Sequence, residues 1–153
     1  MLYFIIMGNS YSSMVLKQMN FEDIQIVIKH PDIYTLINTL PINEQECLIL
    51  NTIPIHSEEF LINQLLKRNK QSFIVIYGKN VYDVSIYKKY KQLTALGFTN
   101  VHVYAGGLFE WALLQDIYTA EHFPTVGTFT DILQYKPSAK ITSHLHRIPM
   151  IMK

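Results

Sequence analysis

Ser72-Phe73-Ile74-Val75-Ile76-Tyr77 is the stretch of sequence that decides the fold. A strand with one solvent-exposed face alternates polar and apolar residues, whereas a continuous apolar run is typical of a strand buried on both faces. Strands of that kind belong to parallel sheets that carry helices on both sides. The run therefore predicts the central strand of a parallel α/β sheet.

The segments around this run alternate between helix and strand. Residues 21–30 are predicted to be a helix, because Ile24, Val27 and Ile28 recur at helical spacing and Pro31 would end it. Next come a predicted strand at 34–40, a short strand or extended connection at 47–55, and a helix capped by Ser57. After the central run, a turn at 78–83 leads into a helix that ends near Leu96, with Gly97 as its cap. The last predicted elements are a strand at 100–104, a helix from Gly106-Gly107 to Tyr118, and a short element at 131–135. This order predicts an α/β domain with a mainly parallel sheet.

Composition limits the class of protein. The chain has 153 residues, of which 49% are hydrophobic and 16% are charged, values that a disordered protein would not have. Its net charge of +1 lacks the basic excess of most nucleic-acid binders, so no nucleic acid is expected as a partner. No apolar run approaches the roughly 18 residues of a membrane span, so no transmembrane segment is expected.

The N-terminal residues permit two interpretations. Residues 1–7 (MLYFIIM) are apolar but short, and the first interpretation is a buried or partly buried first strand within an N-terminal extension, 1–20. The second applies only if translation starts at Met7, because Gly8 would then match an acceptor for N-myristoylation. One acyl chain without a basic patch gives only weak membrane association.

Four motifs give the chain a resemblance to a known family. The helix and strand of residues 21–40, the central strand Ile74-Val75-Ile76-Tyr77, the run Leu96-Gly97-Phe98-Thr99-Asn100-Val101, and Gly106-Gly107 followed by Trp111 resemble the corresponding parts of a rhodanese domain. The resemblance covers about residues 21–124. It leaves 125–153 as a C-terminal arm.

The resemblance implies both a fold and a reaction. Such domains have three layers, with about five mainly parallel strands and helices on both faces. The family transfers sulfane sulfur through a persulfide on a cysteine that directly follows the central strand. Some relatives are protein phosphatases, and others have lost the cysteine and serve as binding or regulatory modules.

The sequence departs from the family pattern at two places. Gly78 stands where the cysteine nucleophile is expected, and glycine has no side chain from which to form a thiolate. The Asp-x-Arg that normally closes the second strand is replaced by Asn38-Thr39-Leu40, so both charges are gone. The two losses together predict that the sulfurtransferase chemistry is absent.

Cys47 is the only cysteine in the chain. It lies in an apolar run, where a lone cysteine is usually a small buried hydrophobe. The alternative is an enzyme, a sulfurtransferase or a phosphatase-like hydrolase, that uses Cys47 or another non-standard nucleophile. A single cysteine also excludes an intrachain disulfide, which favours a reducing, cytoplasmic location.

The loop after the central strand is the predicted ligand-binding site. A loop that joins the carboxyl end of a strand to a helix directs backbone N–H groups inward, where an anion is favoured. A small anionic ligand or an unknown protein partner is therefore expected at this loop, and the alternative is that Tyr82 closes it and it only connects two elements. The loop residues are Gly78, Lys79, Asn80, Val81, Tyr82 and Asp83.

No cofactor or metal is predicted. His144 and His146 would share a face of a strand, but no third ligand is evident near them. The sequence contains neither a nucleophile elbow nor a glycine-rich phosphate loop.

The leading hypothesis follows from the missing cysteine at position 78 and from the loop after the central strand. It is a catalytically inactive rhodanese-like binding or regulatory module.

Overall fold

The computed structural model describes residues 15–141. Within these residues a parallel sheet of four strands has the order β1-β5-β4-β2. The strands are β1 (Gln18–Met19), β2 (Tyr34–Asn38), β4 (Phe73–Tyr77) and β5 (Val101–Tyr104). β4 lies between β2 and β5 and pairs with both along its length, so the prediction that 72–77 is the central strand is confirmed.

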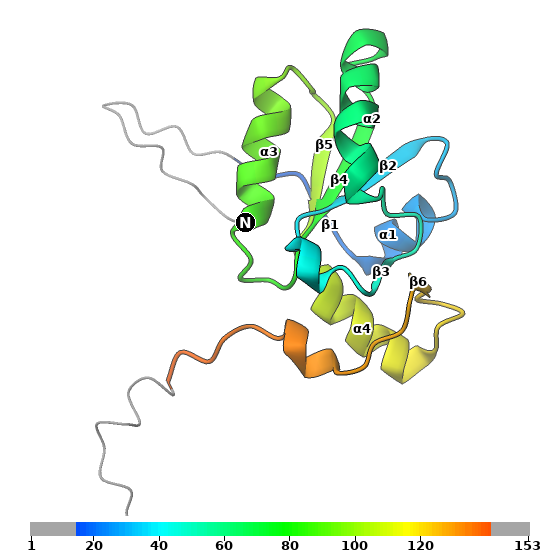
Figure 1. The fold of residues 1–153 in the computed structure, drawn as a ribbon, viewed down its shortest axis with the longest axis vertical. Helices are drawn as coiled ribbons and strands as arrows, with labels where there is room; N and C mark the ends of the chain where they lie inside the picture. Colours follow the sequence, from blue (N-terminus) through cyan, green and yellow to red (C-terminus); the bar gives the residue numbers. More distant parts are fainter. Residues whose placement is uncertain (1–14, 142–153) are drawn as a thin grey trace, which may run out of the picture.

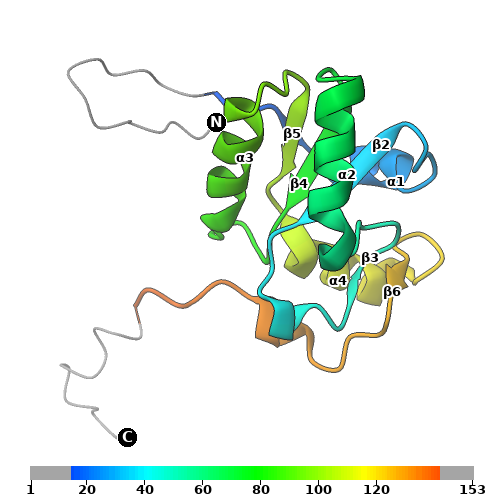
Figure 2. The ribbon, with the colours of Figure 1, turned by 45° about the horizontal axis from the view of Figure 1, so that its top comes forward.

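Helices cover both faces of the sheet (Figure 1). α2 (Ile55–Arg68) and α3 (Ser85–Ala95) pack on the face that carries Ile74 and Ile76, and Figure 2 shows them side by side in front of the strands. α1 (Phe21–Val27) and α4 (Gly107–Tyr118) pack on the face that carries Val75 and Tyr77. This alternation along β4 explains why the run has no polar position, because each side chain enters one of two cores.

The sheet departs in one respect from the expected five strands. β3 (Leu48–Ile49) pairs with β6 (Thr125–Val126) in a separate antiparallel ribbon, instead of joining the main sheet. Only an isolated parallel bridge between Leu36 and Thr52 links this region to β2. Pro54 lies two residues further on and has no N–H to donate, so the segment turns into α2 before a longer strand can form.

The helix ends follow local sequence signals, with one correction. Asn20 and Asp23 form a reciprocal capping box at the start of α1, and Gly97 ends α3 with a φ of +107°, as a left-handed cap requires. The prediction that Ser57 caps α2 is wrong. The helix begins three residues earlier, with Pro54 at the N-cap position and no side-chain cap, so Ser57 lies inside the first turn.

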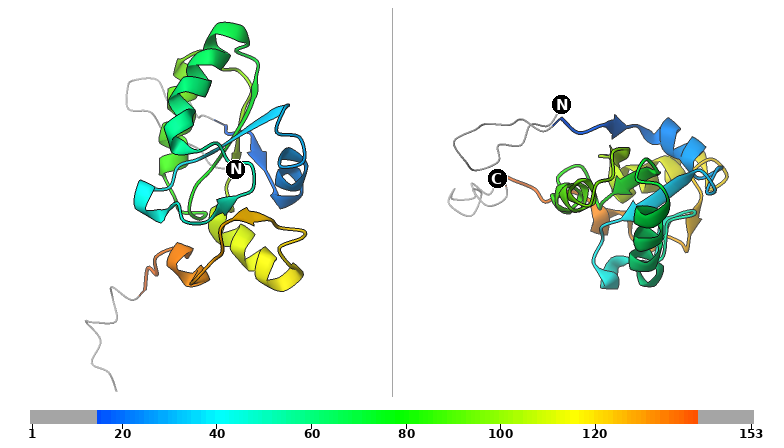
Figure 3. Two further views of the ribbon diagram at one scale, coloured as in Figure 1. Left: turned by 45° about the vertical axis from the view of Figure 1, so that its right-hand side comes forward. Right: turned by 90° about the horizontal axis from the view of Figure 1, so that it is seen from above.

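The packed part of the chain extends to both sides of residues 21–124. β1 pairs with β5 through Gln18 and Met19, and Leu16 is buried among the residues of the α2–α3 face. After α4, β6 pairs with β3, and the short 3₁₀ helix η2 (Ile132–Tyr135) contacts α4. Figure 3 shows η2 and α4 together at one end of the sheet.

Several sequence-based interpretations concern residues outside the described part. These are the first strand at 1–7, N-myristoylation of Gly8, and the pair His144 and His146. Among residues 15–141, no helix is long and apolar enough to cross a membrane. The same residues contain no cluster of His, Cys, Asp and Glu side chains with the geometry of a metal site.

Candidate functional site

The candidate site lies at the carboxyl end of β4, where three connections meet. These are the loop 78–83, the end of β2 at Asn38, and the turn into α4 at Gly106-Gly107. A further wall comes from the 3₁₀ helix η1 (Ile42–Glu44). In open α/β sheets, ligands bind at this edge of the strands.

Gly78 is closely packed on the side to which a side chain would point. A Cβ atom at this position would lie 2.5 Å from Asp83 Oδ2 and 2.9 Å from Ile86 Cγ2, which is closer than van der Waals contact allows. The Gly78 carbonyl accepts a hydrogen bond of 2.9 Å from the Leu108 N–H. A side chain at the position that follows the central strand would therefore require the side chains of Asp83 and Ile86 to move.

The glycine pair at the start of α4 is needed for a close backbone approach. Gly107 has a φ of +66°, and a Cβ atom there would lie 2.6 Å from the Gly78 carbonyl oxygen. One residue further on, the Phe109 N–H donates to the Lys79 carbonyl over 2.9 Å. The predicted tight strand-to-helix turn is confirmed, and it locks the first two residues of the loop to α4.

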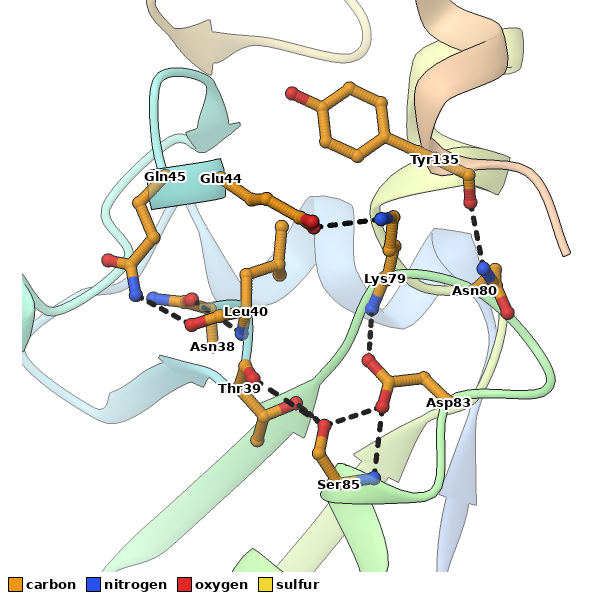
Figure 4. A network of polar contacts seen from close by, with 10 residues as sticks. All are labelled: Asn38, Thr39, Leu40, Glu44, Gln45, Lys79, Asn80, Asp83, Ser85 and Tyr135. Carbon is orange, nitrogen blue, oxygen red and sulfur yellow. Dashed lines mark hydrogen bonds and ion pairs between the residues drawn. The ribbon is translucent and has the colours of Figure 1, made fainter. Parts of the chain in front are cut away.

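Asp83 fills the concave side of the loop with its carboxylate (Figure 4). Its Oδ2 accepts a hydrogen bond of 2.7 Å from the Lys79 N–H, and its Oδ1 accepts one of 2.9 Å from the Ser85 N–H. The Ser85 hydroxyl also donates to Oδ1 over 2.6 Å and lies 2.7 Å from Thr39 Oγ1. The donors that would bind an external anion are thus engaged by an internal one.

Lys79 is paired as well. Its Nζ lies 2.8 Å from Glu44 Oε2, and both side chains are about one-third exposed, at 28% and 33%. Exposure weakens such a pair, because water and salt screen the charges. The pair still tethers the loop to η1 and neutralises the only cation of the loop.

Asn80 ties the loop to the C-terminal part of the chain. Its Oδ1 accepts a hydrogen bond from the Tyr82 N–H over 3.0 Å, which makes a tight Asx-turn. Its Nδ2 donates to the Tyr135 carbonyl over 2.8 Å in a buried position. Both ends of this buried amide are therefore used, one within the loop and one across to η2.

The outer side of the loop is apolar and exposed. Val81, Tyr82 and Val84 are 49%, 62% and 73% exposed. Tyr82 does not close the loop, because it is largely exposed and the Asp83 carboxylate occupies the inner side instead. That the loop only connects two elements stays an alternative. Lys140 Nζ lies 5.7 Å from the centre of the Tyr82 ring, within the range of a cation–π contact.

An open pocket of about 450 Å³ adjoins the loop. Its lining includes three lysines from two segments, Lys79, Lys136 and Lys140, and the carboxylates of Glu44 and Asp83. A larger cavity of about 820 Å³ lies between α2 and α3, and Thr39 and Ser85 line both. The Asp83–Ser85–Thr39 contacts therefore form the partition between them, and only the smaller pocket faces the loop.

The replaced motif at the end of β2 is a neutral turn. Asn38 is buried, and its Oδ1 accepts a hydrogen bond from the Leu40 N–H over 3.1 Å. Its Nδ2 has no hydrogen-bond partner. Gln45 closes the turn from outside by donating to the Leu40 carbonyl over 2.9 Å.

Cys47 is buried, with 1% of its surface exposed. Burial raises the pKa of its thiol, although a hydrogen bond with the Thr125 side chain opposes the shift. Nucleophilic sulfur chemistry needs a thiolate that solvent and substrate can reach. The environment of Cys47 therefore favours an unreactive thiol, as expected for a small core residue.

Two parts of the site carry no local sequence signal. Glu44 and Tyr135 contribute to it from segments distant in sequence, and neither belongs to a motif. The only available clue was that residues 131–135 read as a short helical element after the compact pattern ends. Asp83 was within the predicted loop, but its inward carboxylate depends on how Ser85 and Thr39 are placed.

The fold and the position of the loop define a class of protein: a parallel α/β domain whose site follows its central strand. The model of the rhodanese-like domain family matches residues 37–114. The chain belongs to the rhodanese-like domain family.

Solved structures agree with this fold. The BH2092 protein from Bacillus halodurans shares 20% identity with a TM-score of 0.58, over 84% of this chain and 89% of that chain. The single-domain sulfurtransferase RDL2 of Saccharomyces cerevisiae shares 16% identity with a TM-score of 0.53, over 74% of this chain and 100% of that chain. At these identities the similarity shows the fold alone. A comparison with curated proteins finds no match.

Proposed function

We propose that this chain is a catalytically inactive rhodanese-like module that binds a protein partner through the surface around residues 78–83. The observation that carries the proposal is the lack of a side chain at Gly78 and the close packing around it. The family resemblance places the nucleophile at this position, which here has no side chain and is packed against the Asp83 carboxylate.

The absence of a usable thiolate supports the non-catalytic part. Sulfane-sulfur transfer requires a thiolate to attack and hold sulfur. Cys47 is the single cysteine of the chain, its thiol is buried, and its pKa is raised. The competing function, a sulfurtransferase or a phosphatase-like enzyme that uses Cys47, would require this thiol to become exposed and ionised.

The exposed side chains of the loop favour a protein partner over a small anion. The Asp83 carboxylate already engages the Lys79 and Ser85 N–H groups, and a bound anion would have to displace it. Val81, Tyr82 and Val84 present apolar surface beside the pocket, and aromatic residues of this kind are enriched in interfaces. The single cysteine is consistent with a cytoplasmic setting for such a module.

An activity assay tests the first part of the proposal. The full chain is incubated with thiosulfate and cyanide, and its intact mass is followed for an adduct of about 32 Da, one sulfur atom on a thiolate. We expect neither turnover nor adduct. Turnover that disappears in Cys47→Ser would overturn the proposal and establish the enzyme.

Site-specific cross-linking tests the second part. A photoreactive amino acid replaces Tyr82 on the loop or, as the matched control, Phe60 on α2, which is 67% exposed. We expect a partner that cross-links at position 82 and not at position 60, and that is lost when Val84 is changed to Ser. Equal cross-linking at both positions would contradict a loop-specific partner. Tight binding of sulfate or phosphate to the unmodified chain would instead support the anion alternative.

A further inference from the structure

The chain carries a segment across the candidate site that the family match does not include. The match ends at residue 114, whereas residues 125–135, here called the strap, run from β6 to the end of η2. The strap passes the edge of the domain at which β4 ends (Figures 1 and 2). It contacts both β3 and α4.

The first half of the strap covers Cys47. β6 pairs antiparallel with β3, so that Ile49 lies opposite Thr125. Gly127 has a φ of +83°, and a Cβ atom there would lie 2.4 Å from the Glu46 carbonyl oxygen and 3.5 Å from Cys47 Cα. The backbone of the strap is therefore in direct contact with the segment that carries the thiol.

The second half of the strap is held by Tyr135. This side chain is 2% exposed, and its ring packs edge-on against Phe129 with centroids 5.7 Å apart. The ring extends from η2 toward Glu44, while the backbone carbonyl of the same residue accepts the hydrogen bond from Asn80 (Figure 4). Tyr135 thus links η2 to the loop 78–83.

Beyond β6, the strap is held mainly by the packing of Phe129 and Tyr135 against the core. Tyr135 is its only buried residue, and Leu133 is 59% exposed. Segments with few buried contacts open locally at a lower free energy than the whole domain. Opening of this half should therefore depend mainly on Tyr135 and its hydrogen bond with Asn80. Opening of the first half must also break the β3–β6 pairing and the hydrogen bond from Gln115 to Thr125.

We propose that the strap opens and closes as a unit over the candidate site. The buried side chain of Tyr135, here called the latch, and the hydrogen bond from Asn80 to the Tyr135 carbonyl hold it closed. In the closed state the strap shields Cys47 and brings Lys136 and Lys140 to the pocket beside the loop. In the open state Cys47 is accessible and the pocket loses one wall. A ligand that contacts both the loop and these lysines would hold the strap closed, a consequence that rests on the proposed function.

Alkylation of Cys47 reports strap opening, because the full chain has no other cysteine. The rate is measured with iodoacetamide for the unmodified chain and for two pairs of variants. Tyr135→Ala removes the latch, with Leu133→Ala as its control in the same 3₁₀ helix. Asn80→Asp keeps the acceptor for the Tyr82 N–H but removes the donor to Tyr135, with Asn63→Asp as a control of equal charge on the exposed surface of α2.

We expect slow alkylation of the unmodified chain and of both controls. Both latch variants should react about tenfold faster or more, because loss of a buried ring or a buried hydrogen bond shifts a local opening equilibrium. The acceleration should persist at low urea concentration, where local opening is insensitive to denaturant and global unfolding is not.

Two results would overturn the proposal that the strap opens locally. One is a latch variant that reacts no faster than its control. The other is a rate that rises only in proportion to the loss of global stability, measured on the same variants by urea unfolding. Neither result touches the proposed function, which is tested by cross-linking at position 82 and does not require the strap to move.

Discussion

The carboxylate of Asp83 lies 2.7 Å from the backbone nitrogen of Lys79 and occupies the concavity of the loop that follows the central strand. Through this contact, a carboxylate of the loop satisfies a backbone N–H of the same loop. It supplies an anion where backbone N–H groups point inward, and it fills the space in which a side chain at position 78 would stand. The predictions for position 78 and for anion binding below depend on this contact.

Restoring a cysteine at position 78 should not restore a reactive thiol. Gly78→Cys places a Cβ atom 2.5 Å from Asp83 Oδ2 and 2.9 Å from Ile86 Cγ2, so we expect a loss of about 1–3 kcal/mol in the free energy of unfolding and no persulfide. Urea unfolding and intact mass after thiosulfate measure the two effects.

The double variant Gly78→Cys with Asp83→Ala separates the effect of the Asp83 carboxylate from that of the other contacts at position 78. Removing the carboxylate relieves the closest clash, and the double variant should be more reactive than the single one. A single variant as stable as the unmodified chain that also takes up sulfur would show that the loop has more room than its packing indicates.

Removing the internal anion should create an external anion site. Asp83→Ala frees the Lys79 and Ser85 N–H groups, and we expect it to cost about 1–3 kcal/mol, because charge-assisted hydrogen bonds are lost. Sulfate should then raise the Tm of this variant by a few degrees and leave the unmodified chain unchanged. Asp116→Ala, at an exposed position of α4, is the control. An equal response of all three proteins to sulfate would contradict the assignment.

The ion pair between Lys79 and Glu44 should contribute little to stability. Both side chains are about one-third exposed, at 28% and 33%, so a double-mutant cycle with Lys79→Ala and Glu44→Ala should give a coupling below about 1 kcal/mol. The coupling should fall further in about 1 M salt, where charges are screened within a few ångströms. A coupling that is large and independent of salt would mean that the pair is effectively buried.

Stability should fall at alkaline pH. Burial raises the pKa of Cys47 and of Tyr77, whose hydroxyl lies 2.8 Å from Thr52 Oγ1 and accepts the Ile49 N–H over 3.2 Å. The folded chain therefore keeps these protons when the unfolded chain releases them, so their contribution is complete below the ordinary thiol and phenol pKa values of about 8.5 and 10. It is lost as the pH rises above them.

Urea unfolding between about pH 8 and 11 measures this slope. Tyr77→Phe should be less stable at neutral pH by about 1–3 kcal/mol, because the Ile49 N–H loses its acceptor. Its stability should decline less steeply with pH than that of the unmodified chain. Parallel curves for the two proteins would exclude Tyr77 as a source of the alkaline loss.

Much of the fold could be predicted because its signals are local. The continuous run 72–77 needs two covered faces, Gly97 adopts the left-handed conformation that ends α3, and Gly107 provides the close approach to Gly78. Each signal concerns a residue and its immediate neighbours. The start of α2 is mispredicted because Ser57 is a favourable cap residue, whereas the helix begins after Pro54, whose side chain cannot cap it.

For the candidate site, the sequence predicts where the loop lies but not the contacts within it. That a loop follows β4 at the ligand-binding edge of the sheet could be read from the sequence, as could the absence of a cysteine at position 78. That Asp83 turns inward depends on Ser85, and that Glu44 pairs with Lys79 depends on where η1 lies. Such contacts form between segments that only the packed sheet brings together.

The sequence by itself determined the alternation of elements, the two-sided burial of β4 and the lack of a nucleophile after it, because these depend on residue type and short-range spacing. Only the tertiary structure decided that the Asp83 carboxylate lies inside the loop, that Cys47 is buried, and that residues 125–135 contact β3, α4 and the loop. The hydrogen bond from Asn80 to Tyr135 joins residues 55 positions apart, and no local pattern specifies a pairing of that range.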